Sequence, residues 1–576
     1  MPQRASAAQP HVEIAGRTFD EPSTAELMEV VVDTDLTAVS SCTITILDMD
    51  RVALDGVDYR SPVKIKAPSL ADDGDNDLHD LFVGEVYGME FEADERGTYS
   101  RITAFDQTYR LKQDRVTKAR QSVTDSDIAG EIAKAAGLRV GRVDRTAVVH
   151  EHIGQINQTN WDFLRERAAA NGFEVFIADG ALNFRKPDEA STGPDAGGHT
   201  SQDPLQLTSG KNLFHLRTRT TAAQQVGEVE VRGWDPAQKK EVVSTAAAAT
   251  SATKLATSAV KAADRAGGAT RITGRAELAS QAACDALATA LSERTASTFS
   301  YAEGTAVGDP RLLAGAVVSV GESGRFDGQY LLTRARHTFR PGDYQTTFTV
   351  SGSHDRTRFG LRQDVKEESW YGTYPALVTS VKDPKELGRV RLQFPWLDPS
   401  YESDWARVVQ IGAGDQEGLL WFPEVNDEVL VSFMRGDARF PTVIGGMYNG
   451  KDKPPFPDHI GPDGKIEIRG MRSGAGHQVV FFDKPGEERI EIASSAGSCT
   501  IVLDEVTKTV TVESKGDVQV KSGAKVEVQA SGDVTVTSGA NVTVEATANV
   551  EIKAGANLTL SASGVVEIKG SLVKLN

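Results

Sequence analysis

The sequence predicts a mainly β protein with some α-helix: hub β-barrel domains with helical insertions, a further small barrel, and a C-terminal needle of intertwined β-rungs. Three observations favour this class. An eight-residue repeat runs through 510–568, short aromatic strands fill 369–450, and β-like runs alternate with turns and a few helices before residue 350. The predicted boundaries are a hub at 1–350, a linker at 351–368, a barrel at 369–450, a neck with the first β-structure at 451–509, and the needle at 510–576.

The repeat is built from pairs of the form apolar-x-apolar. Two residues before each new pair stands Gly or Ala, from Gly516 to Gly564. A helix needs a period of 3.6 residues, so a strict period of eight with β-branched pairs indicates stacked β-rungs joined by tight turns. The predicted needle-core residues are Val510, Val512, Val518, Val520, Val526, Val528, Val534, Val536, Val542, Val544, Val550, Ile552, Leu558, Leu560, Val566 and Ile568.

Each rung offers only two large apolar side chains, too few for the core of a single-chain β-helix. Several copies wound together would bring these pairs to one axis, and we expect three copies. With a strand spacing of about 4.7 Å, eight rungs form a rod on the order of 40 Å long. The alternatives are an aggregation-prone, low-complexity β segment and a fibre-like adhesin stalk.

The composition of the chain excludes several classes of function. The chain has 576 residues and a net charge of -18, which argues against general nucleic-acid binding and against a polybasic lipid site. Three dispersed cysteines without a CxxC pair predict neither a disulfide framework nor a zinc site. We find no apolar signal core and no apolar run of about 18 residues. The expected protein is made in the cytoplasm without a signal peptide and has no stable membrane insertion.

The first 350 residues predict a small β-barrel over 11–115, followed by mixed structure. Predicted helices cover 124–137, capped by Thr124 or Asp125, 161–170, capped by Asn160, and 276–293. Further strands are predicted at 173–177, 182–185, 316–320 and 346–350. An Ala-rich stretch at 245–268 predicts an exposed insertion or a poorly packed helix.

Three patterns in this region resemble metal-binding or catalytic motifs but lack residues that such motifs require. The acidic loop 72–77 lacks the Gly and Glu that a calcium loop requires at positions six and twelve. His150 and His152 have no third ligand nearby, so we predict no metal. Gly321–Gly324 lacks the Gly-x-Ser-x-Gly spacing of a nucleophile elbow. We therefore predict no catalytic, cofactor-binding or metal-binding residues.

Residues 369–450 predict about five short strands in a closed barrel of the OB type. The aromatic residues could stack nucleic-acid bases, but neighbouring acidic residues such as Glu424 and Asp427 oppose that use. We interpret the aromatics as core. They are Trp396, Trp405, Trp421, Phe422 and Phe433. A proline-rich neck at 454–457 follows.

Within this barrel the sequence resembles the VgrG spike proteins. Gly388–Trp396, Trp405–Val408, Phe422–Val431 and Pro441–Asn449 are similar to that family's barrel signature, in the same order. Asn426 stands where the family usually has Gly, and Asn tolerates the positive φ of such a turn. The front half resembles the hub domain of this family and of contractile-phage tails, through Gln155–Leu164 and Phe326–Tyr330.

The resemblance implies a central spike of a contractile injection system that links the inner tube to a piercing tip. The implied partners are two further copies, inner-tube and baseplate proteins, a PAAR-like tip protein and effector cargo. For tip docking we predict Gly570, Leu572, Val573 and Leu575. The parent machine is a phage tail, a type VI apparatus or a phage-like particle, in the cytoplasm or released. A glycan-binding tail fibre and a spike that carries a hydrolase are the alternatives.

Overall fold

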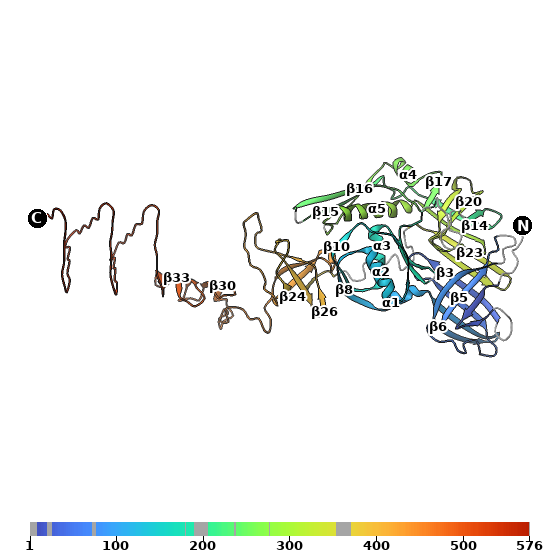
Figure 1. The fold of residues 1–576 in the computed structure, drawn as a ribbon, viewed down its shortest axis with the longest axis horizontal. Coiled ribbons are helices and arrows are strands. Elements are labelled where there is room, and N and C mark those ends of the chain that lie inside the picture. Colours follow the sequence, from blue (N-terminus) through green and yellow to red (C-terminus); the bar gives the residue numbers. More distant parts are fainter. Residues whose placement is uncertain are drawn as a thin grey trace. The chain divides into compact units, whose positions relative to one another are not determined.

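The computed structural model describes residues 9–19, 26–71, 77–178, 180–188, 190, 205–235, 238–275, 277–352 and 370–574. This part contains thirty-four strands and five α-helices, which confirms the predicted mainly β class (Figure 1). It divides into two compact units, Met1–Lys453 and Pro454–Asn576. Across the described ranges, no helix combines the length and apolarity needed to cross a membrane.

One antiparallel sheet joins the first strands of the first unit to the strands that precede the barrel, because β22 pairs with β3 from Arg334↔Asp35 to Phe339↔Val30. The two β regions of the predicted hub therefore share one sheet. Val32, Ile44 and Ile102 lie in its fully buried core. In order, its strands are β14 (Leu213–Thr220), β19 (Ser300–Val307), β23 (Asp343–Val350), β22 (Arg334–Arg340), β3 (Glu26–Asp35), β4 (Ser41–Leu47), β7 (Gly97–Phe105), β6 (Leu78–Asp94), β5 (Pro62–Pro68), β1 (His11–Ile14) and β2 (Arg17–Thr18).

An α/β insertion packs its helices around Trp161, Phe163 and Phe184. Thr124 caps the second helix in a reciprocal capping box with Asp127, as the sequence predicts. Thr159, and not the predicted Asn160, caps the third. The elements are η1 (Gln107–Tyr109), α1 (Arg110–Gln113), β8 (Arg115–Thr124), α2 (Asp125–Ala135), β9 (Arg139–Val143), β10 (Val149–Thr159), α3 (Asn160–Asn171), β11 (Glu174–Ala178) and β12 (Ala181–Arg185).

Much of the Ala-rich stretch is exposed, as predicted, but several of its alanines pack into a small core. Ala248, Ala259 and Ala262 are buried against Ala296 and Phe299, because small side chains allow the backbones to approach closely. The predicted helix 276–293 begins later, after its Ser280 cap. The elements here are β13 (Leu205–Thr208), β15 (Glu228–Asp235), β16 (Lys240–Ala247), β17 (Thr253–Leu255), α4 (Ala259–Arg265), β18 (Thr270–Gly274), α5 (Gln281–Ser297), β20 (Val317–Gly321), η2 (Gly324–Phe326) and β21 (Gly328–Leu331).

The predicted small barrel is closed. Its ring runs β24–β28–β29–β27–β25 and returns to β24, and β26 extends it from β25. Asn426 has φ 76°, so it occupies the left-handed turn conformation that the sequence predicts. The strands are β24 (Thr373–Ser380), β25 (Arg389–Phe394), β26 (Asp398–Glu402), β27 (Ala406–Val408), β28 (Glu428–Phe433) and β29 (Pro441–Gly446), with η3 (Met434–Gly436) after β28.

The prediction that all five barrel aromatics are core is wrong for two of them. Phe433 is buried, whereas Trp396 and Trp421 are each about half exposed. Trp396 stacks on Tyr374 with ring centroids 5.6 Å apart and donates its Nε1–H to Pro375 O at 2.8 Å. It lies outside the barrel core because its ring covers the barrel's side and its N–H needs a partner.

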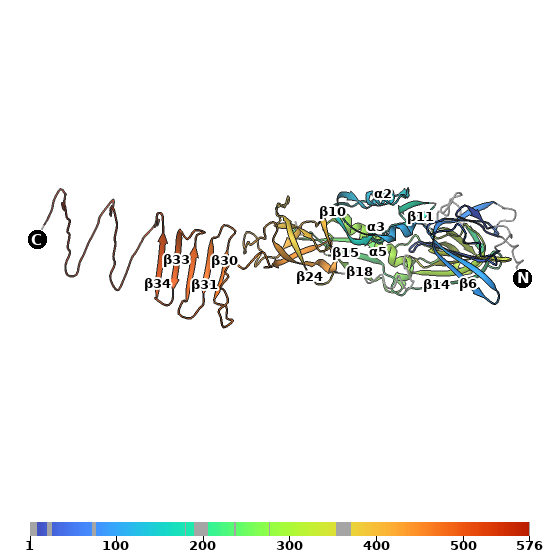
Figure 2. The same cartoon turned by 90° about the horizontal axis from the view of Figure 1, so that it is seen from below.

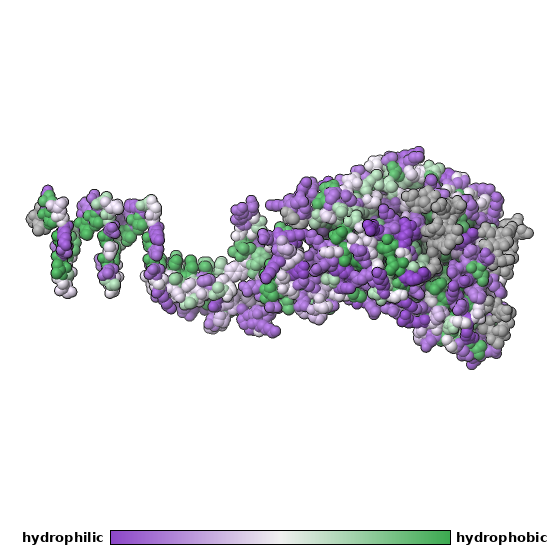
Figure 3. Space-filling model, in the orientation of Figure 1, coloured by the Kyte–Doolittle hydropathy of each residue, from purple (hydrophilic) through white to green (hydrophobic). Residues whose placement is uncertain are grey.

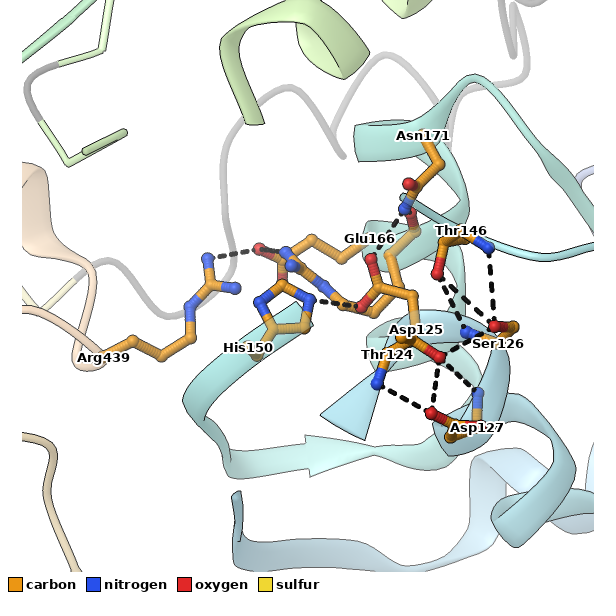
Figure 4. A network of polar contacts seen from close by, with 10 residues as sticks. Thr124, Asp125, Ser126, Asp127, Thr146, His150, Glu166, Asn171 and Arg439 are labelled. Atoms are coloured by element: carbon orange, nitrogen blue, oxygen red, sulfur yellow. Dashed lines mark hydrogen bonds and ion pairs between the residues drawn. The ribbon is translucent and has the colours of Figure 1, made fainter. Parts of the chain in front are cut away.

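The barrel is joined to α3 by a partly buried ion pair between Arg439 and Glu166, 2.6 Å apart (Figure 4). On the barrel side, Arg439 also contacts Asp437 at 2.6 Å. Burial disfavours its charge, but the two carboxylates outweigh burial and raise the pKa of Arg439. Beside this ion pair, Ile156 packs into the barrel core.

Of the two neighbouring histidines, only His152 contacts the barrel. His150 Nε2 lies 2.9 Å from Asp125 Oδ1 inside the insertion (Figure 4), and His152 Nε2 lies 3.2 Å from Glu402 O of the barrel. The two rings therefore have different partners. No group of three or more possible metal ligands occurs among the described residues. The acidic loop 72–76 lies outside the described residues.

We expect Arg439→Met to destabilise the first unit by about 2 kcal/mol, since it removes the cation that joins the partly buried Glu166 to Asp437, and Glu166 then retains Arg167 at 3.1 Å but loses its link to the barrel. Lys385→Met is the matched control, because Lys385 pairs with Glu151 in an ion pair exposed on both sides and should cost under about 0.5 kcal/mol. Denaturant unfolding of the full chain measures both changes. Equal effects of the two substitutions would show that the buried pair does not hold the barrel.

Candidate assembly site

The second unit begins with a five-stranded antiparallel meander (Figure 2), whose strands follow one another in chain order. Its last strand, β34, contains Val510 and Val512, so the first predicted needle pair pairs with β33 of the same chain. The strands are β30 (Ile468–Arg472), β31 (Gln478–Phe482), β32 (Arg489–Ala493), β33 (Cys499–Asp504) and β34 (Thr509–Ser514).

The register of the meander gathers apolar side chains into two cross-strand rows on one face. One row is Met471, Val479, Ile492, Ile501 and Val512. The other is Phe481, Ile490, Leu503 and Val510. Apart from Val479, which is half-buried, these side chains are substantially exposed in the single chain.

The opposite face of the meander is mixed. It carries polar side chains such as Glu491, Thr500 and Thr511, because neighbouring residues of a strand point to opposite faces. The two rows therefore form a continuous apolar surface, whereas the opposite face combines these polar residues with the buried Val480 and Ala493. We call this surface the apolar face.

Sequence reasoning missed most of the apolar face. Its signal was the same apolar-x-apolar pair that marks the needle, at Val479/Phe481, Ile490/Ile492 and Ile501/Leu503. These pairs start eleven, eleven and nine residues before the next one, so they fall outside the period of eight. The longer spacing accommodates the turns of an antiparallel meander.

Beyond β34 the chain is extended. Residues 515–574 pair with no strand of the described chain. All fourteen predicted core residues from Val518 to Ile568 are more than half exposed. Figure 3 shows hydrophobic surface along this C-terminal segment. Such a segment has neither a hydrophobic core nor paired backbone of its own.

The rungs nevertheless have two distinct sides. Lys525 pairs with Glu527, and Lys553 pairs with Glu551 at 2.6 Å. These pairs bracket a core residue, so the charged side chains lie on the side opposite to the valines. The alternation supplies one apolar and one solvated side per rung.

Serine side chains fix two of the turns between rungs. Ser522 Oγ accepts from the Ala524 N–H at 3.2 Å and donates to Lys525 O at 3.1 Å. Ser538 makes the same two bonds with Ala540 and Asn541. These hydrogen bonds hold a tight turn at the predicted small residues.

At the end of the described chain, Gly570, Leu572 and Val573 of the predicted tip lie in an extended segment, with Leu572 and Val573 exposed. Leu575 lies outside the described residues. Docking at these residues stays a prediction.

Curated relatives match about a fifth of the chain. Over 112 residues it is 36% identical to the type VI secretion system spike protein VgrG3 of Vibrio cholerae, which covers 18% of this chain and 11% of that protein. Over 113 residues it is 35% identical to the actin cross-linking toxin VgrG1 of Vibrio cholerae, again 18% of this chain and 10% of the relative. The chain thus spans about a tenth of the length of these relatives.

A solved structure shows the fold over a longer stretch. A chain in the structure of the Francisella PdpA–VgrG complex, half-lidded, aligns with a TM-score of 0.53 at 9% identity, covering 88% of this chain and 87% of that one. The predicted resemblance to VgrG spikes is confirmed.

Two family models match. Residues 374–448 match the type VI secretion system/phage-baseplate injector OB domain, which corresponds to the closed barrel. Residues 5–340, more than half of the 576, match the Alg8 N-terminal domain. The chain belongs to the family described by that Alg8 N-terminal domain, and it has the fold of a VgrG-like spike.

Proposed function

We propose that this protein is the structural central spike of a contractile phage-tail-like injection system. In this function it links the inner tube to the piercing tip and punctures the target envelope when the sheath contracts. The observation that carries the proposal is the apolar face, which continues into rungs that have no core of their own. A chain that leaves this surface exposed needs partners that cover it.

The partners we propose are two further copies of the same chain. Burying a valine side chain stabilises a structure by about 1.5–3 kcal/mol, and every rung contributes two apolar side chains. Winding three copies together buries these pairs at one axis and pairs the extended backbones between chains. Because a strand can then leave only by breaking contacts with both partners, the needle resists unfolding under load.

The proposed role is mechanical, not catalytic. The actin cross-linking activity named for one relative belongs to a protein of which this chain covers only 10%. The proposed binding partners are inner-tube and baseplate proteins and effector cargo. A PAAR-like tip protein would dock at Gly570–Val573. The spike would be made in the cytoplasm, reside in a cytoplasmic or released particle, and reach the target membrane on firing.

We expect a native mass of about 185 kDa for the full chain, three times the 61.8 kDa of one copy. Light scattering coupled to size-exclusion chromatography measures it. A monomer at micromolar concentration would contradict the interwound needle.

Val512 and Thr511 are neighbours in β34 but lie on opposite faces of the meander, so substitutions at these two positions compare the contributions of the two faces to stability. We expect Val512→Glu to destabilise the trimer by at least about 3 kcal/mol per copy, since it places carboxylates inside the proposed core. Thr511→Glu, on the opposite face of β34, should change stability by under about 1 kcal/mol. Thermal unfolding followed by calorimetry decides between them, and equal losses would argue against a buried apolar face.

Puncturing can be tested in assembled particles. We expect particles that carry the Val512→Glu chain to contract on triggering but to release far less dye from target vesicles than particles with Thr511→Glu. The reason is that a needle with a weakened core unfolds under the load of contraction. Undiminished dye release with Val512→Glu would contradict a piercing role for the needle.

A further inference from the structure

A hairpin between β27 and β28 of the barrel is ordered although its side chains lie in solvent. Every residue from 411 to 420 is exposed. The two arms are nevertheless joined, because Leu419 N–H donates to Ile411 O at 3.1 Å. We call residues 409–421 the barrel hairpin. Since its conformation is fixed before any contact is made, a partner would not have to order it on binding.

The base of the barrel hairpin is fixed as firmly as its arms. Trp421 N–H donates to Gln410 Oε1 at 2.9 Å, and Gln410 Nε2 donates to Trp421 O at 3.2 Å. Val409 N–H donates to Val443 O of β29 at 2.9 Å, which ties the hairpin to the barrel wall. Gly418 has φ 133°, and a Cβ there would lie 2.2 Å from a carbonyl oxygen of the opposite arm. The close approach of the two arms therefore requires glycine at this position.

The barrel hairpin exposes a cluster of large apolar side chains. Leu419, Leu420 and Trp421 are consecutive and exposed, and in the described part of the first unit no other three consecutive large apolar residues are exposed. On the opposite arm Ile411 is 80% exposed, which is close to the 78% of Leu420. Exposed apolar clusters mark interaction sites, and tryptophan is enriched at the energetic centres of interfaces.

The charge around this cluster has one sign. Residues 409–428 contain five carboxylates and no Lys, Arg or His. Among the described residues, no cation lies within 4 Å of any of the five. Elsewhere in the barrel, by contrast, Asp383 pairs with Arg389 at 2.6 Å. The five are Asp415, Glu417, Glu424, Asp427 and Glu428.

We propose that the barrel hairpin docks a partner protein whose contact surface is apolar at its centre and rimmed by lysine or arginine. The centre would cover the exposed apolar side chains, and the rim would pair with the carboxylates. Contact between the hairpins of two copies is disfavoured, since it would bring carboxylates together and supply no cation. The inference goes beyond the proposed function, because it concerns the first unit and does not depend on the needle.

The probes are two fluorescein-labelled amphipathic helices with the same leucine face. One carries lysine at its remaining positions, and the other carries glutamate there. Fluorescence anisotropy measures their binding to the full chain. We expect the lysine helix to bind about tenfold more tightly than the glutamate helix, and the difference to shrink as salt is added. Equal binding of the two helices overturns the proposal.

Charge reversal on the barrel hairpin tests where the lysine helix binds. Asp415→Lys/Glu417→Lys should weaken its binding about tenfold. Asp50→Lys/Asp55→Lys is the matched control, because it changes the net charge of the chain equally at exposed positions of the hub, and it should leave binding unchanged. Equal weakening by the control would mean that the acidic chain as a whole attracts the helix, which overturns docking at the hairpin.

Removing the apolar side chains tests the other half of the proposal. Ile411→Ser/Leu420→Ser should weaken the lysine helix about tenfold without lowering the unfolding temperature, since both side chains are exposed in the folded chain. Tyr371→Ser removes another exposed apolar side chain, just before β24, and should leave binding unchanged. Full binding by the hairpin variant overturns the proposal.

Hydroxyl-radical footprinting of the full chain identifies a competing occupant. We expect Leu420 and Trp421 to be oxidised in the free chain and protected by the lysine helix. Protection without the helix, in a trimer measured by light scattering, would mean that another copy covers the hairpin, and it overturns the proposal. A monomer that still binds the lysine helix through Leu420 contradicts the needle and supports docking at the hairpin, so the two proposals fail separately.

Discussion

The fold of the second unit depends on one constraint: an extended chain cannot leave its backbone groups unpaired and its valines in water. The meander satisfies the backbone part of this constraint within one chain, since every strand from β30 to β34 has an antiparallel neighbour. It does not satisfy the apolar part, because one face keeps Ile492 and Leu503 exposed. From residue 515 onward neither part is satisfied within the described chain. The need for partners thus increases along the sequence.

In the proposed function the first unit faces a different demand, because it would pass force from a tube to a needle through the barrel. The barrel is held on the hub by side chains that are buried together, notably Arg439 with Glu166 and Ile156 with the barrel core. Gly154 adds a close approach, since a Cβ there would lie 2.5 Å from Tyr401 Oη. A seat made of several short contacts from β10 and α3 resists tilting better than a linker could.

Local sequence patterns predicted local structure well in this chain. A helix cap at Thr124 or Asp125, a left-handed turn at Asn426 and a closed barrel all followed from short motifs. Features that join distant segments were not predictable in this way. The pairing of β22 with β3 links residues about 300 positions apart, and no periodicity announces it.

The errors have physical causes of their own. The Ala-rich stretch looked poorly packed because alanine offers little apolar area, yet small side chains permit the tight contact with Phe299. Trp396 looked like core because tryptophan is large and apolar, but its N–H bonds to a backbone carbonyl at the barrel surface. Most of the apolar face was missed because its pairs break the period of eight that revealed the needle.

This irregularity of the meander has a use in the proposed trimer. Rungs with a strict eight-residue repeat can pair equally well when one chain slips by a whole rung, since every Val-x-Val pair meets another one. Register is well specified only where the pattern is unique. The meander provides that uniqueness, because its pairs are spaced by eleven, eleven and nine residues and its apolar rows include Phe481 and Met471. Strand β34 belongs to both regions, so three aligned meanders would deliver three chains to the first rung in the same register. A needle made of repeats alone would lack such a starting point, and the non-repeating segment before it is therefore as necessary to the spike as the repeat itself.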